Sequence, residues 1–247
     1  MQHLNKYLAL ALMTVTLSGC QLLHLTTLYN DETSFEENSL RFDAQHQPIT
    51  GVYQKYNDKK QLKEEIHYVD GKISGRYQAF GENGTLIMEA FYKDGLLHGK
   101  MITYYASGEK YEIAAYKEDK LEGALLVYYP NGFLLRKGSY LNGLKNGVFE
   151  DYYPNGGVKF SKTYLNGKLH GPSRTYSDKS QMINYTEYEN GLRNGPAYSY
   201  YANDKPKVLA TRKNDRLSGP AKYFDKNGNL EKVVRFEDNR ELEVIKF

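Results

Sequence analysis

Past its first forty residues, the chain alternates short β-rich stretches with tight-turn residues, and a turn signal recurs about every 12 positions. In one clear example, the apolar and β-branched stretches 148–153 and 158–164 are separated by Pro154-Asn155-Gly156 and followed by Asn166-Gly167. Asn-Gly and Asp-Gly favour two-residue hairpin turns, in which both residues need positive φ. A helical apolar period of 3.6 does not survive turns so closely spaced. The pattern therefore predicts antiparallel strand pairs.

The strand pairs repeat with a period of 24 residues. One glycine column is complete: Gly51, Gly75, Gly99, Gly123, Gly147, Gly171, Gly195 and Gly219. An aromatic column is complete as well: Tyr56, Phe80, Tyr104, Tyr128, Tyr152, Tyr176, Tyr200 and Phe224. A further, mostly aromatic column holds Tyr68, Tyr92, Tyr116, Tyr140, Tyr164, Tyr188, Arg212 and Phe236. Fixed spacing of this kind is typical of repeat proteins, so residues 45–236 are predicted to form eight units.

Eight two-stranded units predict an all-β fold, an elongated and twisted antiparallel meander. The complete glycine and aromatic columns are interpreted as structural, with the rings packing across strands next to glycines. Residues 40–42 are expected to form half a repeat that caps the start, and 241–247 a closing strand. The expected glycine or tyrosine is missing at five positions, so irregular turns are expected chiefly in the sixth and seventh units: Asp119, Ser180, Asp204, Arg212 and Asp215.

The first twenty residues have a different character. A polar start ending in Lys6 is followed by a largely apolar run, 7–17, which is too short to span a bilayer as a helix. Leu17-Ser18-Gly19-Cys20 resembles the lipobox of bacterial lipoproteins, which implies cleavage before Cys20 and acylation of its thiol. The alternative is an ordinary secretory signal with a chance cysteine. The expected organisation is a signal peptide (1–19), a tether (20–39) and a repeat domain (40–247).

Composition limits the chemistry. The formal net charge of +3 argues against a nucleic-acid binder with a broad basic surface. The single cysteine excludes an internal disulfide and a multi-Cys zinc site. No nucleophile elbow, phosphate loop or zinc-protease motif is present. His98 and His170 share a repeat position three units apart and are interpreted as turn residues. We therefore expect no enzyme activity, no metal and no cofactor.

At one position of the repeat, the fold does not require a particular residue type, because several types occur there: Asn57, Gly81, Tyr105, Tyr129, Tyr153, Ser177, Tyr201 and Asp225. Four tyrosines nonetheless gather in it. Exposed tyrosine suits interfaces because it offers a large rigid area and a hydroxyl. We expect Tyr105, Tyr129, Tyr153 and Tyr201 to form a partner-binding face. Simple packing on the second face of the sheet is the alternative.

Units such as 140–156, Tyr-Leu-Asn-Gly-Leu-Lys-Asn-Gly-Val-Phe-Glu-Asp-Tyr-Tyr-Pro-Asn-Gly, resemble the bacterial variant of the MORN repeat. That variant is typical of the YwqK family of antitoxin or immunity proteins. The resemblance implies a membrane-anchored, non-catalytic protein that neutralises a toxin in the cell envelope by binding it. Gln21, in place of an Asp after Cys20, implies the outer membrane, facing the periplasm, in a Gram-negative host. The alternative function is an envelope scaffold or a lipoprotein that binds cell-wall glycans.

Overall fold

The computed structural model describes residues 28–30 and 33–247. The predicted signal peptide, its cleavage site and Cys20 lie outside these residues. Every element of the described chain is a β-strand, which confirms the predicted all-β class. The chain divides into two compact units. Unit 1 holds the described residues up to Glu109 together with Tyr116–Asp119, and unit 2 holds Lys110–Ala115 and Lys120–Phe247.

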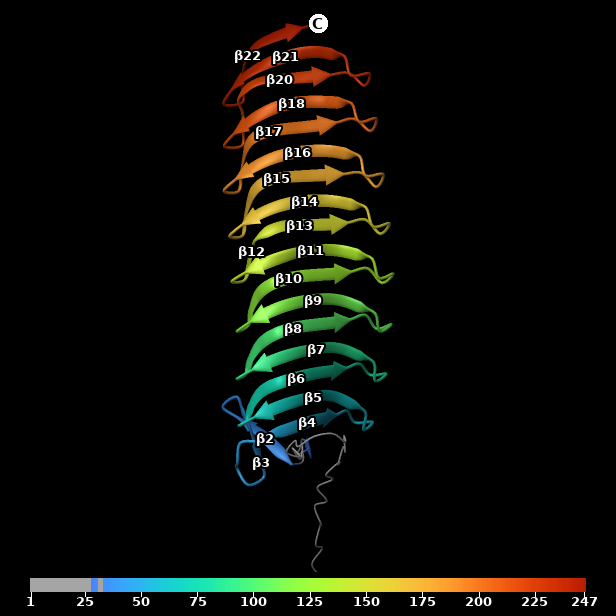
Figure 1. Ribbon diagram of the computed structural model, residues 1–247, viewed down its shortest axis with the longest axis vertical. Coiled ribbons are helices and arrows are strands. Elements are labelled where there is room, and N and C mark those ends of the chain that lie inside the picture. Colours follow the sequence, from blue (N-terminus) through green and yellow to red (C-terminus); the bar gives the residue numbers. More distant parts are fainter. Residues whose placement is uncertain (1–27, 31–32) are drawn as a thin grey trace, which may run out of the picture. The chain divides into compact units, whose positions relative to one another are not determined.

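Unit 1 consists of short paired strands (Figure 1): β1 (Leu28–Tyr29), β2 (Ser34–Glu37), β3 (Leu40–Asp43), β4 (Gly51–Tyr56), β5 (Leu62–Val69), β6 (Lys72–Phe80), β7 (Leu86–Lys93) and β8 (Leu96–Tyr104). Strands β4 to β8 each pair antiparallel with the next along the chain, and β1 lies parallel to β4. Strands β2 and β3 form a separate two-stranded sheet. Part of the segment interpreted as a tether is therefore folded.

The segment at β3 contacts the first hairpins, but it pairs with β2 in a separate sheet and does not form the half repeat expected at 40–42. The Arg41 backbone N–H donates to the Gly71 carbonyl at 2.8 Å, and the Ile49 N–H donates to the Arg41 carbonyl at 3.0 Å. The Arg41 guanidinium also lies 3.9 Å from the centroid of the Tyr53 ring. A cation over an aromatic face adds an electrostatic attraction to this packing.

Strand β9 (Lys110–Lys117) crosses the boundary between the units. The strands that follow it in unit 2 are β10 (Lys120–Tyr128), β11 (Leu134–Leu141), β12 (Leu144–Lys145), β13 (Gly147–Tyr152), β14 (Val158–Leu165), β15 (Lys168–Tyr176), β16 (Met182–Glu189), β17 (Leu192–Tyr200), β18 (Pro206–Lys213), β19 (Arg216–Leu217), β20 (Gly219–Phe224), β21 (Leu230–Glu237) and β22 (Arg240–Lys246). All their pairings are antiparallel and follow chain order (Figure 1). The predicted meander of hairpin repeats is confirmed within each unit.

The short turns have the backbone that the Asn-Gly pairs predict. Asn166 and Gly167 have φ values of 49° and 81°, both positive as a type I′ turn requires. The Gly167 N–H also donates to the Lys145 carbonyl at 2.8 Å, so the turn is bonded to the preceding hairpin. The closing strand expected at 241–247 corresponds to β22.

The prediction of irregular turns is wrong. Asp119, Ser180 and Asp204 each have a φ of 63°, and Asp215 has a φ of 70°, close to the glycines that they replace. Short polar side chains tolerate this left-handed region because they bond locally to the backbone. The carboxylate of Asp119, for example, accepts a hydrogen bond of 2.7 Å from the Leu97 N–H. The missing glycines therefore leave the hairpins unchanged.

Seven glycines of the complete column, all except Gly99, lie opposite a residue of the column that begins with Tyr68. Gly147 on β13, with a φ of 93°, pairs with Tyr164 on β14. The same register joins Gly51 to Tyr68 and Gly219 to Phe236, whereas Gly195 faces Arg212. From the sequence, the rings of the column that begins with Tyr56 are expected to pack next to the glycines. That column lies at the other end of the strands, next to a register shift in each hairpin.

One face of each unit carries most of the buried side chains and is called its core face. In unit 1 the cluster consists of Ile49, Tyr53, Ile66 and Tyr68. In unit 2 one cluster consists of Ala210, Ala221, Val234 and Phe236. Phe149, also buried, lies edge-on to Tyr140 and Tyr164 at centroid distances of 5.4 and 5.2 Å. Neighbouring residues on a strand point to opposite faces. The residues that alternate with the buried ones therefore lie on the opposite face, which is called the open face.

Candidate functional site

Three of the four tyrosines predicted to bind a partner form a ladder of hydrogen bonds between hairpins. The hydroxyls of Tyr129 and Tyr153 donate to the carbonyls of Tyr152 and Tyr176, at 2.8 and 2.9 Å. Tyr201 donates in the same way to Phe224 at 2.9 Å. Each bond joins one hairpin to the next, and Tyr105 occupies the equivalent position after β8. These three hydroxyls are engaged within the sheet, so a partner would meet the rings.

Asparagines two residues further along make a second ladder. The side-chain amides of Asn155 and Asn203 donate to the carbonyls of Asp178 and Lys226, at 3.1 and 2.7 Å. Lysines lie close to two of the tyrosine rings, with Lys159 Nζ 5.5 Å from the Tyr153 centroid and Lys207 Nζ 5.8 Å from that of Tyr201. The edge of unit 2 that carries the turns after β10, β13 and β17 is called the long-turn edge. It thus combines aromatic rings, amides and ammonium groups.

The complete aromatic column lies on the open face, beside the residue two positions earlier on the same strand. The Tyr56 hydroxyl donates to Gln54 Oε1 at 2.8 Å, and that of Tyr152 donates to Glu150 at 2.6 Å. Tyr56 is 45% exposed, which makes its ring a surface feature rather than a core one.

A row of side chains crosses the open face of unit 2, each directly opposite the next. It runs from β11 to β17 and is called the cross-sheet row: Lys137, Glu150, Ser161, Arg174, Tyr185 and Tyr198. Opposite residues of antiparallel strands have Cβ atoms about 5 Å apart, so each side chain can contact its neighbour. The two repeat positions in this row each hold seven different residue types in the eight units.

An ion pair lies at the start of the row. Lys137 Nζ is 2.9 Å from Glu150 Oε2, which also accepts the Tyr152 hydroxyl bond. Partial burial acts to raise the pKa of the Glu150 carboxyl, but the hydrogen bonds from Lys137 and Tyr152 outweigh it and lower that pKa. The hydrogen bond to Glu150 in turn raises the pKa of the Lys137 ammonium. Both groups are therefore charged near neutral pH.

The far end of the row is aromatic. The rings of Tyr185 and Tyr198 are stacked, with centroids 5.6 Å apart and an angle of 24° between planes. The guanidinium of Arg174 lies 5.3 Å from the Tyr185 centroid. The Tyr185 hydroxyl donates to Glu187, and this hydrogen bond, together with partial burial, raises the pKa of the Tyr185 hydroxyl. Arginine and tyrosine side by side are the residue types found most often at energetic centres of interfaces.

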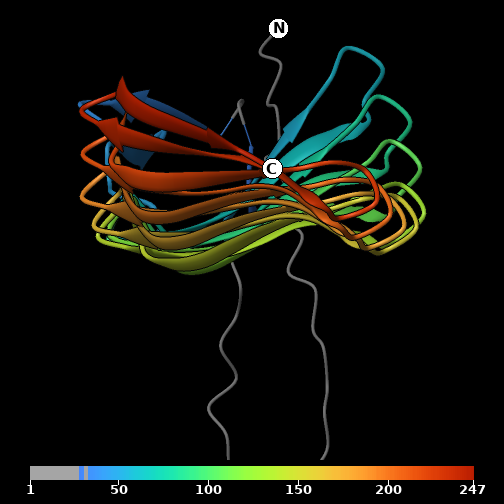
Figure 2. The same cartoon turned by 90° about the horizontal axis from the view of Figure 1, so that it is seen from above.

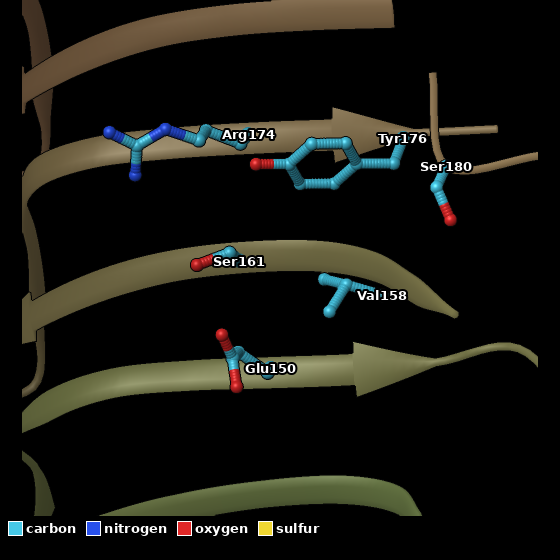
Figure 3. Close-up of a pocket in the computed structure, with 6 residues that line it drawn as sticks. All are labelled: Glu150, Val158, Ser161, Arg174, Tyr176 and Ser180. Atoms are coloured by element: carbon cyan, nitrogen blue, oxygen red, sulfur yellow. The ribbon is translucent and has the colours of Figure 1, made fainter. Parts of the chain in front are cut away.

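A pocket of about 370 Å³ opens beside the middle of the row (Figure 3). Strands β13 and β14 supply Glu150, Val158 and Ser161, while β15 supplies Arg174 and Tyr176. Ser180, from the turn after β15, completes the lining. The pocket thus combines a guanidinium, a carboxylate, three hydroxyls and an aromatic ring.

The core face carries its own charges. Arg136 and Asp151 form a two-bond ion pair, with distances of 2.6 and 2.9 Å. In unit 1, burial, followed by the proximity of Glu64, raises the pKa of the Tyr77 hydroxyl to about 12. These interactions join neighbouring strands and are structural.

His98 and His170, interpreted from the sequence as turn residues, lie instead in strands β8 and β15, each just after a short turn. His170 Nδ1 accepts a long hydrogen bond of 3.5 Å from the Asn190 N–H. Within the described residues, no group of three or more His, Cys, Asp and Glu side chains could hold a metal ion. No helix in that part of the chain is long and apolar enough to cross a membrane.

The sequence interpretation did not single out the cross-sheet row or the pocket. Arg174, Ser161 and Tyr185 occur in no regular column, and a search for recurring residues passes over them. Variation between units could have indicated these residues. The repeat positions that vary from unit to unit are those at which the fold does not require a particular residue type.

This fold defines a tandem β-hairpin repeat protein, whose turns and ring columns are constant and whose open face varies. Seven stretches match the family described as the MORN repeat variant: 49–70, 74–94, 97–118, 121–142, 145–166, 193–214 and 217–238. Together they cover more than half of the chain, which therefore belongs to that family. No curated protein matches the chain. The unit between 167 and 192 is outside the matched stretches, although its strands pair like the others.

Proposed function

We propose that the protein is a non-catalytic, membrane-anchored repeat protein that binds a protein partner, as an immunity or antitoxin lipoprotein that neutralises a toxin in the cell envelope. The observation that carries the binding role is the cross-sheet row. It presents an ion pair, a hydroxyl, a guanidinium and two stacked rings on hairpins that repeat the same strand pairing. A broad face with varied chemistry on a repeated framework suits recognition of another protein.

The open face of unit 2 supplies the kinds of group that such recognition needs. Tyr198 and Tyr185 offer rigid apolar area with hydroxyls at the rim, and Arg174 offers a planar charge for a carboxylate. The rings of Tyr129, Tyr153 and Tyr201 extend the candidate surface along the long-turn edge of unit 2. Tyr105 at the equivalent position in unit 1 is the fourth member of the predicted set.

The anchor in this proposal rests on the sequence around Cys20. Two or three acyl chains on that thiol would hold the chain durably, because each buried CH₂ contributes about 0.8 kcal/mol. In a Gram-negative host we place the protein at the outer membrane, facing the periplasm. Mass spectrometry of the chain extracted in detergent tests this point, since acylated Cys20 must be the first residue and Cys20→Ser must abolish both processing and acylation.

The toxin-neutralising role is tested by expressing the product of the adjacent gene with and without this protein. The expected result is growth arrest by the adjacent product alone, rescue by the full chain, and loss of rescue with Tyr198→Ala. Lys222→Gln is the matched control, because Lys222 occupies the same repeat position one unit further on, beyond the cross-sheet row. Absence of any toxicity to rescue, or of a complex between the two proteins, would contradict the proposal.

A further inference from the structure

The pocket on the open face of unit 2 contains a cation that no carboxylate neutralises. The two acids nearest to Arg174 in the register lie on either side of it, and both have other partners. Glu150 is bound by Lys137 and Tyr152, while Glu187 accepts the Tyr185 hydroxyl. Within the described chain, no acid lies within 4 Å of the Arg174 guanidinium. Its planar fork is therefore available to an external anion.

The arrangement of the other lining residues suggests what the anion is attached to. Figure 3 shows the Tyr176 ring lying along the sheet with its broad side toward the viewer and its hydroxyl toward Arg174. Ser161 and the Glu150 carboxylate lie on the neighbouring strands below, and Ser180 lies beyond the ring. The pocket thus has a flat apolar surface with hydroxyls and a carboxylate around it, groups that can pair with several hydroxyls of one ligand.

The size and charge of the pocket limit the class of ligand that it can bind. A volume of about 370 Å³ is near the lower end of the range of about 300–1,000 Å³ typical of ligand pockets, so one six-membered ring with its substituents fits and a long chain does not. Arg174 supplies a single positive charge, and the Glu150 carboxylate on the same face disfavours a dianion. A ligand with one carboxylate is favoured over one with a phosphate.

We propose that this pocket binds a carboxylated monosaccharide unit. The ligand carboxylate pairs with Arg174, the apolar face of the sugar ring lies on Tyr176, and the sugar hydroxyls bond to Ser161, Ser180 and Glu150. The pocket shares Glu150, Ser161 and Arg174 with the cross-sheet row, but the binding of a small ligand in it does not require the proposed protein partner. The loss of toxin binding would leave this pocket unaffected.

Isothermal titration calorimetry on the full chain in detergent tests the site, with D-glucuronate as the probe. We expect binding to D-glucuronate and roughly tenfold or more weaker binding to D-glucose, which lacks the carboxylate, and to acetate, which lacks the ring. D-glucose 6-phosphate separates the two anions and should bind more weakly than D-glucuronate. Equal or tighter binding of acetate, D-glucose or D-glucose 6-phosphate would overturn the proposal.

Variants then assign the contacts. Arg174→Gln should weaken glucuronate binding roughly tenfold or more, and Arg174→Lys, which keeps the charge but loses the fork, should also weaken it. Tyr176→Leu should weaken glucuronate and leave the weak binding of acetate unchanged. The matched controls occupy the same repeat positions, Lys222→Gln two units beyond Arg174 and Tyr200→Leu one unit beyond Tyr176. Unchanged glucuronate binding by Arg174→Lys and Tyr176→Leu, both folded by circular dichroism, would place the ligand elsewhere and overturn the assignment.

Discussion

The carboxylate of Asp215 accepts two hydrogen bonds from Arg193, one of 3.1 Å from the backbone N–H and one of 2.8 Å from Nε. Asp215 lies in a short turn of unit 2, where most other units have glycine, and Arg193 is the second residue of β17, just after the preceding short turn. The hydrogen bonds from Arg193 lower the pKa of the Asp215 carboxyl. Replacing glycine has thus added a side-chain link between hairpins while keeping the left-handed backbone.

The Asp215 link should be reproduced by asparagine and lost with alanine. Asp215→Ala removes the carboxylate that accepts both bonds and leaves a residue with no side-chain hydrogen bond to support a φ of 70°, so we expect a lower urea midpoint of unfolding. Asp215→Asn should stay near the starting midpoint, because Asn239 already makes the equivalent bond of 2.6 Å to the Leu217 N–H. Equal midpoints for the alanine and asparagine variants would show that the side chain does not stabilise the turn.

Gly138 should not tolerate even a methyl group. A β-carbon there would lie 2.3 Å from the ring of Phe149, so Gly138→Ala should destabilise the fold by roughly 1–3 kcal/mol through overpacking. Phe149→Leu in the same chain should recover part of that loss. Gly157→Ala is the control, since its nearest neighbours would be polar side-chain atoms at 3.3 and 3.5 Å. Urea unfolding is measured for the starting chain, the two single variants, the double variant and Gly157→Ala. Additive effects of the Gly138 and Phe149 changes would contradict the steric explanation.

The Tyr153 hydroxyl should contribute to stability. Tyr153→Phe removes its bond to the Tyr176 carbonyl and should lower the free energy of unfolding by about 1 kcal/mol. Tyr200→Phe should change it little, because the Tyr200 hydroxyl makes no hydrogen bond to the part of the chain that the structure describes. If Tyr153→Phe keeps full stability and loses the partner, the hydroxyl belongs to the interface and not to the sheet.

Glu150 should make part of the stability sensitive to acid. Its carboxyl pKa is lower in the folded chain than the ordinary glutamate value of about 4.5, so the folded state favours the ionised form. Stability from this group is complete above the unfolded pKa, about 4.5, and is lost as pH falls through the lower, folded value. Thermal unfolding across pH 3–7 should show a shallower acid slope for Glu150→Gln. An unchanged slope would exclude the Glu150–Lys137 ion pair as its source.

The repeat and its turns could be predicted from the sequence because they depend on local chemistry. Asn166-Gly167 needs positive φ at two successive residues, and that requirement is visible in the residue types alone. The same reasoning failed at Asp119 and Asp215. Each keeps the turn through a bond to a residue 22 positions earlier, which local propensity does not contain.

The sequence by itself determined the hairpin units, their period and the strand class, because turns and alternating patterns act over a few residues. Only the tertiary structure decided which columns of side chains lie opposite each other on neighbouring strands. The pairing of Gly147 with Tyr164, and the row that brings Arg174 between Ser161 and Tyr185, depend on how neighbouring strands align. A shift of one residue would reverse every side chain, so the chemistry of each face is fixed by register.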